Sequence, residues 1–196
     1  MDISQGKGFE RLFNAIFGKK RSKRNMTNKV EIFTDSVKSN KEAFINEVEA
    51  VSSRLGINPN WLMAVMWKES NLNPKAINPL NKATGLIQFT KSTAKGLGTS
   101  VDALFNMSNV QQLKYVEKYF NTYKSKIKSY YDLYLVTFFP VSLNHDDNWY
   151  FQTPSMTKEY IGQQNSGVNN GKPINKIAFK KYLLGRIDKK YHQYLA

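Results

Sequence analysis

Cysteine is absent from this chain of 196 residues, and histidine occurs only twice. Without cysteine the protein has no disulfide bond, no thiol nucleophile and no thiolate ligand for zinc. The two histidines, His145 and His192, lie far apart in the sequence, which argues against a histidine-based metal site. We therefore expect neither a metal nor another cofactor.

Long hydrophobic runs are also absent. No stretch approaches the roughly 18 apolar residues that are needed to span a bilayer. The first residues lack the uninterrupted apolar segment of a secretory signal, so a protein acting outside the cytoplasm would need another component to export it. Hydrophobic residues nevertheless make up 41% of the sequence and aromatic residues 13%, which is enough for a folded core.

Acidic residues are scarce, because 15 of them stand against 29 lysines and arginines, and the net charge is +14. Residues 1–40 carry a net +5, residues 161–196 a net +6, and the longer middle segment only +3. This distribution predicts a globular domain over 41–160 with a basic extension at each end. The excess charge indicates an anionic partner, such as nucleic acid, anionic lipid or bacterial cell wall, without choosing among them.

Residues 1–29 combine an apolar stripe with a basic run. Five apolar residues at helical spacing between Phe9 and Phe17 are followed by five cations between Lys19 and Arg24. Three interpretations remain open. The segment is an amphipathic helix on a membrane, a peptide that docks on a partner protein, or a short helix that caps the core before a solvated linker.

The rest of the sequence predicts helices separated by clear start and stop signals. Asn58 and Pro59 are typical of an N-cap and a first helical position, and Gly56 is typical of a helix end. Ser108 and Gln111 have the spacing of a capping box. No alternating pattern indicates a strand. The predicted helices cover 41–55, 59–70, 90–95, about 108–120, 129–139, 154–163 and 175–187.

Glu69 is the only acidic residue between Glu49 and Asp102, an interval that contains six basic residues. Apolar residues seven, four and three positions earlier lie on its helical face. Burial and the partial negative charge of a helix C-terminus both raise the pKa of a carboxyl group. An acid that stays protonated near neutral pH can protonate a leaving oxygen. The alternative is a solvated glutamate that pairs with a lysine.

Two motifs favour the first interpretation. Glu69 and Ser70 end the apolar helix, and the turn Gly85–Gln88 begins sixteen residues after Glu69. In this order and at this spacing, the motifs resemble those of the SLT-type lytic transglycosylases over about 41–98, and the weaker part of the resemblance extends to about 160. The resemblance implies a mainly α fold, a compact helical domain of the goose-type, lysozyme-like α+β superfamily with basic terminal extensions.

The resemblance also implies a reaction and a set of roles. In this family one glutamate protonates the bond between N-acetylmuramic acid and N-acetylglucosamine in peptidoglycan. The same group, now a base, assists attack by the C6 hydroxyl, which yields a 1,6-anhydro sugar. Glu69 would be this catalytic residue, Ser70 would orient Glu69 or the substrate, and Gly85 would allow the glycan to approach the backbone. The cleft would be lined by Leu86 and Ile87, with Gln88 bonded either to the substrate or to loop backbone.

The third family motif is the one from which this sequence departs. Relatives commonly have a tyrosine there whose hydroxyl bonds the glutamate, whereas Phe138 stands at the matching place here. Tyr134 or Tyr131 could supply the hydroxyl, and each of these aromatics could also be a core residue. Hydrolysis with two carboxylates would instead require a second acid about 5–10 Å from Glu69. The candidates for that acid are Asp102, Asp132, Asp146 and Asp147.

The segment 161–196 is predicted to contain a turn and a basic helix. Residues 167–174 faintly resemble a calcium loop, but no acid occurs between Glu159 and Asp188, so calcium binding is rejected. The basic residues expected to face solvent or an anionic surface are Lys176, Lys180, Lys181 and Arg186.

Three functions follow in order of preference. The first is a peptidoglycan lytic transglycosylase, with lysozyme-type hydrolysis as second choice. The others are a non-catalytic module that binds cell wall or membrane on the same scaffold, and a nucleic-acid binder, although nucleic acid is not expected as the main partner. The missing signal and the basic ends would suit a phage virion component or an endolysin, with residues 1–29 contacting an anionic membrane or other virion proteins.

Overall fold

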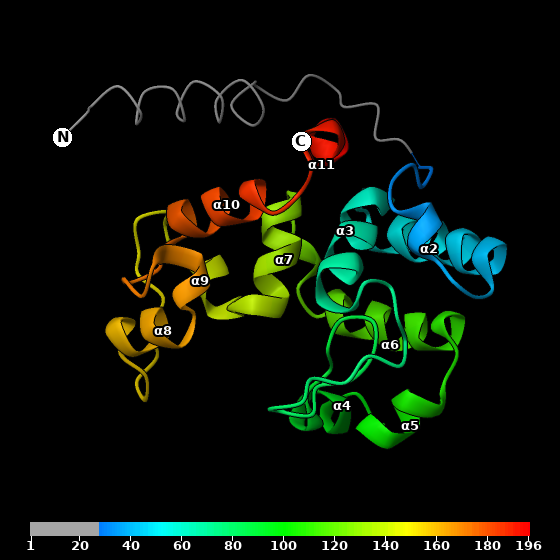
Figure 1. Cartoon of the computed structure of the whole chain (residues 1–196), viewed down its shortest axis with the longest axis horizontal. Helices are drawn as coiled ribbons and strands as arrows, with labels where there is room; N and C mark the ends of the chain where they lie inside the picture. Colours follow the sequence, from blue (N-terminus) through cyan, green and yellow to red (C-terminus); the bar gives the residue numbers. More distant parts are fainter. Residues whose placement is uncertain (1–27) are drawn as a thin grey trace.

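The computed structural model describes residues 28–196, and these residues form a mainly helical structure, as predicted (Figure 1). Within them, β structure is limited to four isolated bridges, two in the loop 77–89 and two that involve the segment 150–156. None of the described helices is both long and apolar enough to cross a membrane. The α-helices are α2 (Lys41–Leu55), α3 (Pro59–Ser70), α4 (Lys91–Gly96), α5 (Val101–Asn106), α6 (Asn109–Asn121), α7 (Tyr130–Phe138), α8 (Lys158–Gln164), α9 (Ser166–Asn169), α10 (Lys176–Gly185) and α11 (His192–Leu195).

Helix α3 lies at the centre of the core. The side chain of Asn58 accepts a hydrogen bond from the Asn60 amide at 2.9 Å, and Pro59 occupies the first turn, as the sequence predicts. Every residue from Pro59 to Met66 is buried, because α2, α7 and α11 all pack against this helix. A helix that is apolar on all sides in this way is a core helix.

The remaining helix starts follow the predicted caps in most places. Ser108 and Gln111 form the complete capping box at the start of α6, and Ser129 caps α7. The predicted helix over 154–163 begins later, at α8, because Thr157 provides the N-cap and the residues before it form a turn. The short helix α5, capped by Ser100, was not predicted.

The described part of the N-terminal extension is not separate from the core. Ile32, Phe33 and Val37 are buried, and the ring of Phe33 stacks on Trp67 of α3 with centroids 4.4 Å apart. Residues 1–27 lie outside the described residues, and with them the predicted apolar stripe and basic run.

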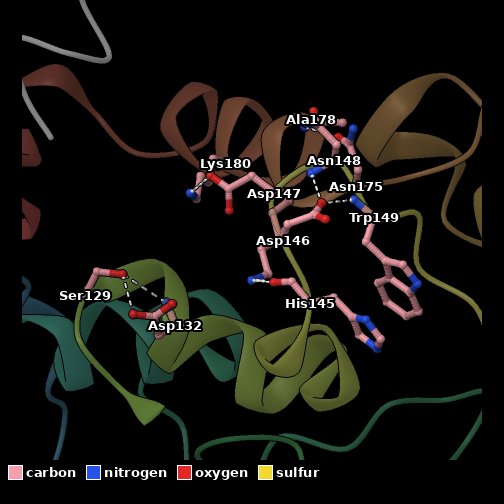
Figure 2. Close-up of polar contacts among 11 residues, drawn as sticks. Ser129, Asp132, His145, Asp146, Asp147, Asn148, Trp149, Asn175, Ala178 and Lys180 are labelled. Carbon is pink, nitrogen blue, oxygen red and sulfur yellow. Dashed lines mark hydrogen bonds and ion pairs between the residues drawn. The ribbon is translucent and has the colours of Figure 1, made fainter. Parts of the chain in front are cut away.

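The C-terminal segment also shares this core. Phe179 of α10 is fully buried and stacks on Phe138 of α7 with centroids 4.5 Å apart. The expectation that the α10 lysines face solvent is wrong for two of them. Lys176 is buried and donates to the His145 carbonyl, and Lys180 pairs with Asp147 at 2.8 Å (Figure 2). A single cluster of buried residues therefore extends across the predicted boundary at residue 160.

A matched pair of substitutions tests this shared core. Ile174 is fully buried, whereas the side chain of Ile177, three residues later, is 45% exposed. We expect Ile174→Val to lower the free energy of unfolding by about 1 kcal/mol, because a buried methylene is lost, and Ile177→Val to leave it nearly unchanged. Urea denaturation of both variants measures the difference. Equal small effects would show that 161–196 contributes little to the cooperative core.

Candidate functional site

Glu69 lies in the last turn of α3 and is half-buried. The hydroxyl of Tyr134, on α7, donates a hydrogen bond to its carboxylate. The two helices pack together, so this bond joins two core elements and fixes the direction of the glutamate. Lys68 is the charged neighbour that acts on it.

The pKa of Glu69 is raised above its ordinary value of 4.5 because burial disfavours the carboxylate. The hydrogen bond from Tyr134 and the charge of Lys68 both favour the carboxylate and oppose this rise, but burial is the larger effect. The fold thus favours the protonated form of Glu69 more than water does.

The charge of Glu69 also raises the pKa of two further tyrosines, Tyr119 and Tyr130. Burial, with smaller contributions from Tyr123 and Glu69, raises the pKa of Tyr119 to about 12, and its hydroxyl donates to the Val136 carbonyl at 2.7 Å. The pKa of Tyr130 is also raised, first by burial and then by Tyr131 and Glu69. Among the described residues, no group is in hydrogen-bond range of the buried Tyr130 hydroxyl.

The structure separates the aromatics that the sequence left as alternatives. Tyr134 contacts Glu69, whereas the ring of Tyr131 lies under the ammonium of Lys180 at 5.7 Å. Phe138 stacks on Phe179 of α10. Tyr134 therefore brings to Glu69 the hydroxyl that Phe138 lacks.

Tyr134→Phe is expected to raise the pKa of Glu69 further. The lost hydrogen bond favours the ionised carboxylate, so its removal shifts the equilibrium toward the protonated acid. Carbon-detected NMR titration of the Glu69 carboxyl measures the shift. Tyr119→Phe is the matched control, because its hydroxyl donates to a backbone carbonyl. A pKa that fell, or moved equally in both variants, would contradict the assignment.

The turn 85–88 is tied to α3 through Ser70. The Ser70 hydroxyl lies 3.0 Å from the Met66 carbonyl and 2.9 Å from the Leu86 carbonyl, so it joins the end of α3 to the turn. Both hydrogen bonds of the Ser70 hydroxyl thus go to backbone carbonyls, and its predicted role in orienting Glu69 or the substrate stays a prediction. Leu86 is fully buried and Ile87 is 5% exposed, so both side chains belong to the core, and their role in lining a cleft stays a prediction. Their burial anchors the turn beside Glu69.

Gly85 is required by the fold itself. Its φ of +82° is in the left-handed region, and a Cβ atom there would lie 2.4 Å from Oε1 of Gln112. The predicted reason for this glycine was the approach of a glycan, but the neighbour on that side is the Gln112 amide. The glycine thus allows α6 and the turn to meet.

Gln88 has its side-chain amide bonded to loop backbone. Its Nε2 donates to the Gly85 carbonyl at 3.1 Å and lies 3.4 Å from the Ala76 carbonyl. Its φ of +54° is uncommon for a residue with a side chain. Of the two sequence alternatives, the structure shows the bonds to loop backbone, and a role toward a substrate stays a prediction for its Oε1.

Three of the four aspartates that were considered as a second acid have hydrogen-bond or ion-pair partners elsewhere in the fold. Asp132 accepts from Ser129 and the Lys128 amide, Asp146 accepts from the amides of Asn148 and Trp149, and Asp147 pairs with Lys180 (Figure 2). Asp102 lies in the first turn of α5. Among the residues that the structure describes, Lys68 is the charged group that shifts the pKa of Glu69. In residues 28–196, moreover, no three His, Asp or Glu side chains gather in a way that could hold a metal ion.

Gln112 is the residue that sequence reasoning missed. It is fully buried on α6, accepts from the Leu86 amide at 2.9 Å, and donates to the carbonyls of Pro74 and Leu104 at 2.7 and 2.8 Å. One amide therefore holds the turn, the loop before it and the end of α5 together. Its position directly before the apolar Leu113, on the buried face of a well-capped helix, is the signal that was available.

Taken together, these contacts present one carboxyl group that can give up and take back a proton. The residues 47–137, which run from α2 into α7 and include Glu69, Tyr134 and the turn, match the protein family described as Transglycosylase SLT domain. No curated protein and no solved structure matches the chain. Over that segment the match supports the resemblance drawn from the motifs.

Proposed function

We propose that the protein is a lytic transglycosylase that cleaves the glycan strand of peptidoglycan, with Glu69 as its catalytic residue. The match over residues 47–137 implies this activity and this substrate. The observation that carries the residue assignment is the half-buried Glu69 carboxyl with a raised pKa and a hydrogen bond from Tyr134. The proposal extends to the single-glutamate chemistry and to the 1,6-anhydro product.

In the first step Glu69 acts as a general acid. Its proton passes to the oxygen of the bond between N-acetylmuramic acid and N-acetylglucosamine, and the bond from that oxygen to C1 of the muramyl sugar breaks. The sugar takes on oxocarbenium character and Glu69 becomes a carboxylate. Burial serves this step because it raises the pKa and keeps a larger fraction of Glu69 protonated.

In the second step the same carboxylate acts as a base. It accepts the proton of the C6 hydroxyl while O6 forms a bond to C1, which closes the 1,6-anhydro ring and returns Glu69 to its acid form. No water is consumed. Between the two steps Glu69 is a carboxylate, and the hydrogen bond from Tyr134 stabilises this ionised form. The opposing effects of burial and Tyr134 thus match the two roles of one group.

The surroundings of Glu69 favour this chemistry over two-carboxylate hydrolysis. A hydrolase of that kind needs a second carboxyl group about 5–10 Å from the first, so that the two groups flank the bond that is cleaved. Asp132 and Asp146 are occupied as caps of helix and turn, and Asp147 is paired with Lys180. These three aspartates have structural partners of their own, which favours Glu69 as the acid that carries both steps.

Mass spectrometry of the fragments released from purified peptidoglycan tests the proposal. We expect fragments that end in 1,6-anhydro-muramic acid, with the mass of one water less than the reducing form. Reducing ends would favour lysozyme-type hydrolysis. Protein that sediments with the cell wall and releases no fragments would favour the non-catalytic binding module. Association with a phage particle, and the contacts of residues 1–29, stay predictions from the sequence.

A further inference from the structure

A groove of about 460 Å³ lies between α9 and α10, which are neighbours in the fold (Figure 1). It is outside the family-matched segment 47–137. The side chains and backbone that line it come from one side of each helix and from the turn after α9. The lining residues are Gly167, Val168, Asn169, Asn170, Ala178, Lys181, Tyr182, Gly185 and Arg186.

The groove is positively charged. Lys181 and Arg186 line it, two asparagines add side-chain amides, and none of the lining residues is acidic. Arg186 is exposed, with its guanidinium carbon 5.3 Å from the centre of the Tyr182 ring. None of the ion pairs among residues 28–196 involves Arg186. A guanidinium held over an aromatic ring offers paired donors that fit a carboxylate.

The groove also adjoins the Glu69 site. Tyr182 lines the groove, and the ammonium of Lys68, the residue next to Glu69, lies 5.8 Å from the centre of its ring. On the same helix Phe179 packs edge-on against Tyr134 with centroids 5.7 Å apart. Helix α10 therefore lines the groove with one set of residues and, through Phe179, supports the tyrosine that bonds Glu69.

We propose that this groove binds a carboxylate of the peptide that peptidoglycan carries on its muramyl sugar. The inference rests on the proposed function, because Glu69 would act at C1 of that same sugar. The peptide is attached to the sugar at C3 and extends about 3.3–3.6 Å per residue, so its first few residues reach neighbouring surface. A compact groove with two cations suits one or two carboxylates better than a nucleic-acid strand, which requires a longer basic track.

Paired substrates test the groove directly. Glycan strands that carry peptides are compared with strands from which an amidase has removed them. For Arg186→Gln we expect kcat/KM to fall about tenfold on the peptide-bearing strands and to stay unchanged on the stripped strands. Arg186→Lys should lie between wild type and Arg186→Gln, since it keeps the charge and loses the fork of donors. Lys114→Gln, an exposed residue of α6, is the charge-matched control.

The possible outcomes distinguish a failure of the proposed peptide site from a failure of the proposed cleavage activity. An equal loss on both substrates, or no loss on either, would overturn the peptide site while leaving the cleavage reaction standing. If wild type cleaves neither strand, the proposed function fails and calorimetry with a soluble muramyl tripeptide decides about the groove. Binding that weakens about tenfold in Arg186→Gln supports it. No binding of the tripeptide, or Arg186-dependent binding of a single-stranded oligonucleotide alone, overturns it.

Discussion

Glu69→Gln is expected to lower the rate of glycan cleavage by a factor of about 10³ or more, because the substituted amide can neither donate the proton in the first step nor accept one in the second. Proton transfer by one positioned group contributes a factor of about 10²–10⁴, and here the same group serves both steps. The rate of fragment release from peptidoglycan measures the effect. Glu42→Gln, at an exposed position in the first turn of α2, is the matched control and should cleave at the wild-type rate.

The same variant carries a stability signature. The pKa of Glu69 is raised in the folded protein, so folding favours the protonated form and this stabilisation is lost as the pH rises through the folded pKa. Glutamine resembles the protonated acid. Glu69→Gln should therefore be more stable than wild type at neutral pH, and the difference should vanish below the ordinary pKa of 4.5. An inactive variant that is less stable at neutral pH would indicate a structural defect instead of a lost catalyst.

Gln112→Leu is expected to lower the free energy of unfolding by about 3–6 kcal/mol. The substitution leaves the Leu86 amide and the carbonyls of Pro74 and Leu104 without their partner in the core, and each unpaired buried group costs about 1–3 kcal/mol. Gln111→Leu, one position earlier, is the control. Its exposed side chain makes one capping bond, to the Ser108 amide, so a loss of about 1 kcal/mol is expected.

A local measurement distinguishes the role of Gln112 from general core damage. The amide of Leu86 donates to Gln112, so its hydrogen exchange should accelerate in Gln112→Leu by more than the drop in global stability explains. Cleavage should also weaken under conditions where the variant is folded, because the turn beside Glu69 loses its clamp. If the exchange of the Leu86 amide accelerates only as much as the loss of global stability predicts, Gln112 stabilises the whole fold but does not specifically hold the turn.

The sequence was most informative where the physical signal is local. The cap at Asn58, the proline after it and the apolar run predicted α3 to its last residue, Ser70. The capping box at Ser108 likewise marked the start of α6. Glu69 stood out because its charge conflicts with the apolar face on which it lies, and such a conflict is visible without any tertiary information.

The parts that escaped prediction depend on contacts between distant segments. Tyr130 and Tyr134 are four residues apart on α7 and share a face, but only the docking of α7 on α3 shows that this face meets Glu69. Leu86 was predicted to line a cleft because its turn resembles a family motif, and the sequence did not show that its side chain is fully buried or that Gln112 of α6 holds the turn. Lys176 was predicted to be exposed because of its charge, and its bond to the His145 carbonyl compensates its burial.

The contact between Tyr134 and Phe179 has a consequence for how such a sequence can change over generations. One residue lies inside the family-matched segment and the other lies 45 positions further along the chain, outside it. Phe33, which stacks on Trp67, lies before that segment. Recombination that transferred 47–137 alone into another protein would carry Glu69 and Tyr134 but leave behind the two rings that pack on Trp67 and Tyr134. Inheritance of the working site therefore requires the flanking segments to travel with it, or to be replaced by rings of matching shape.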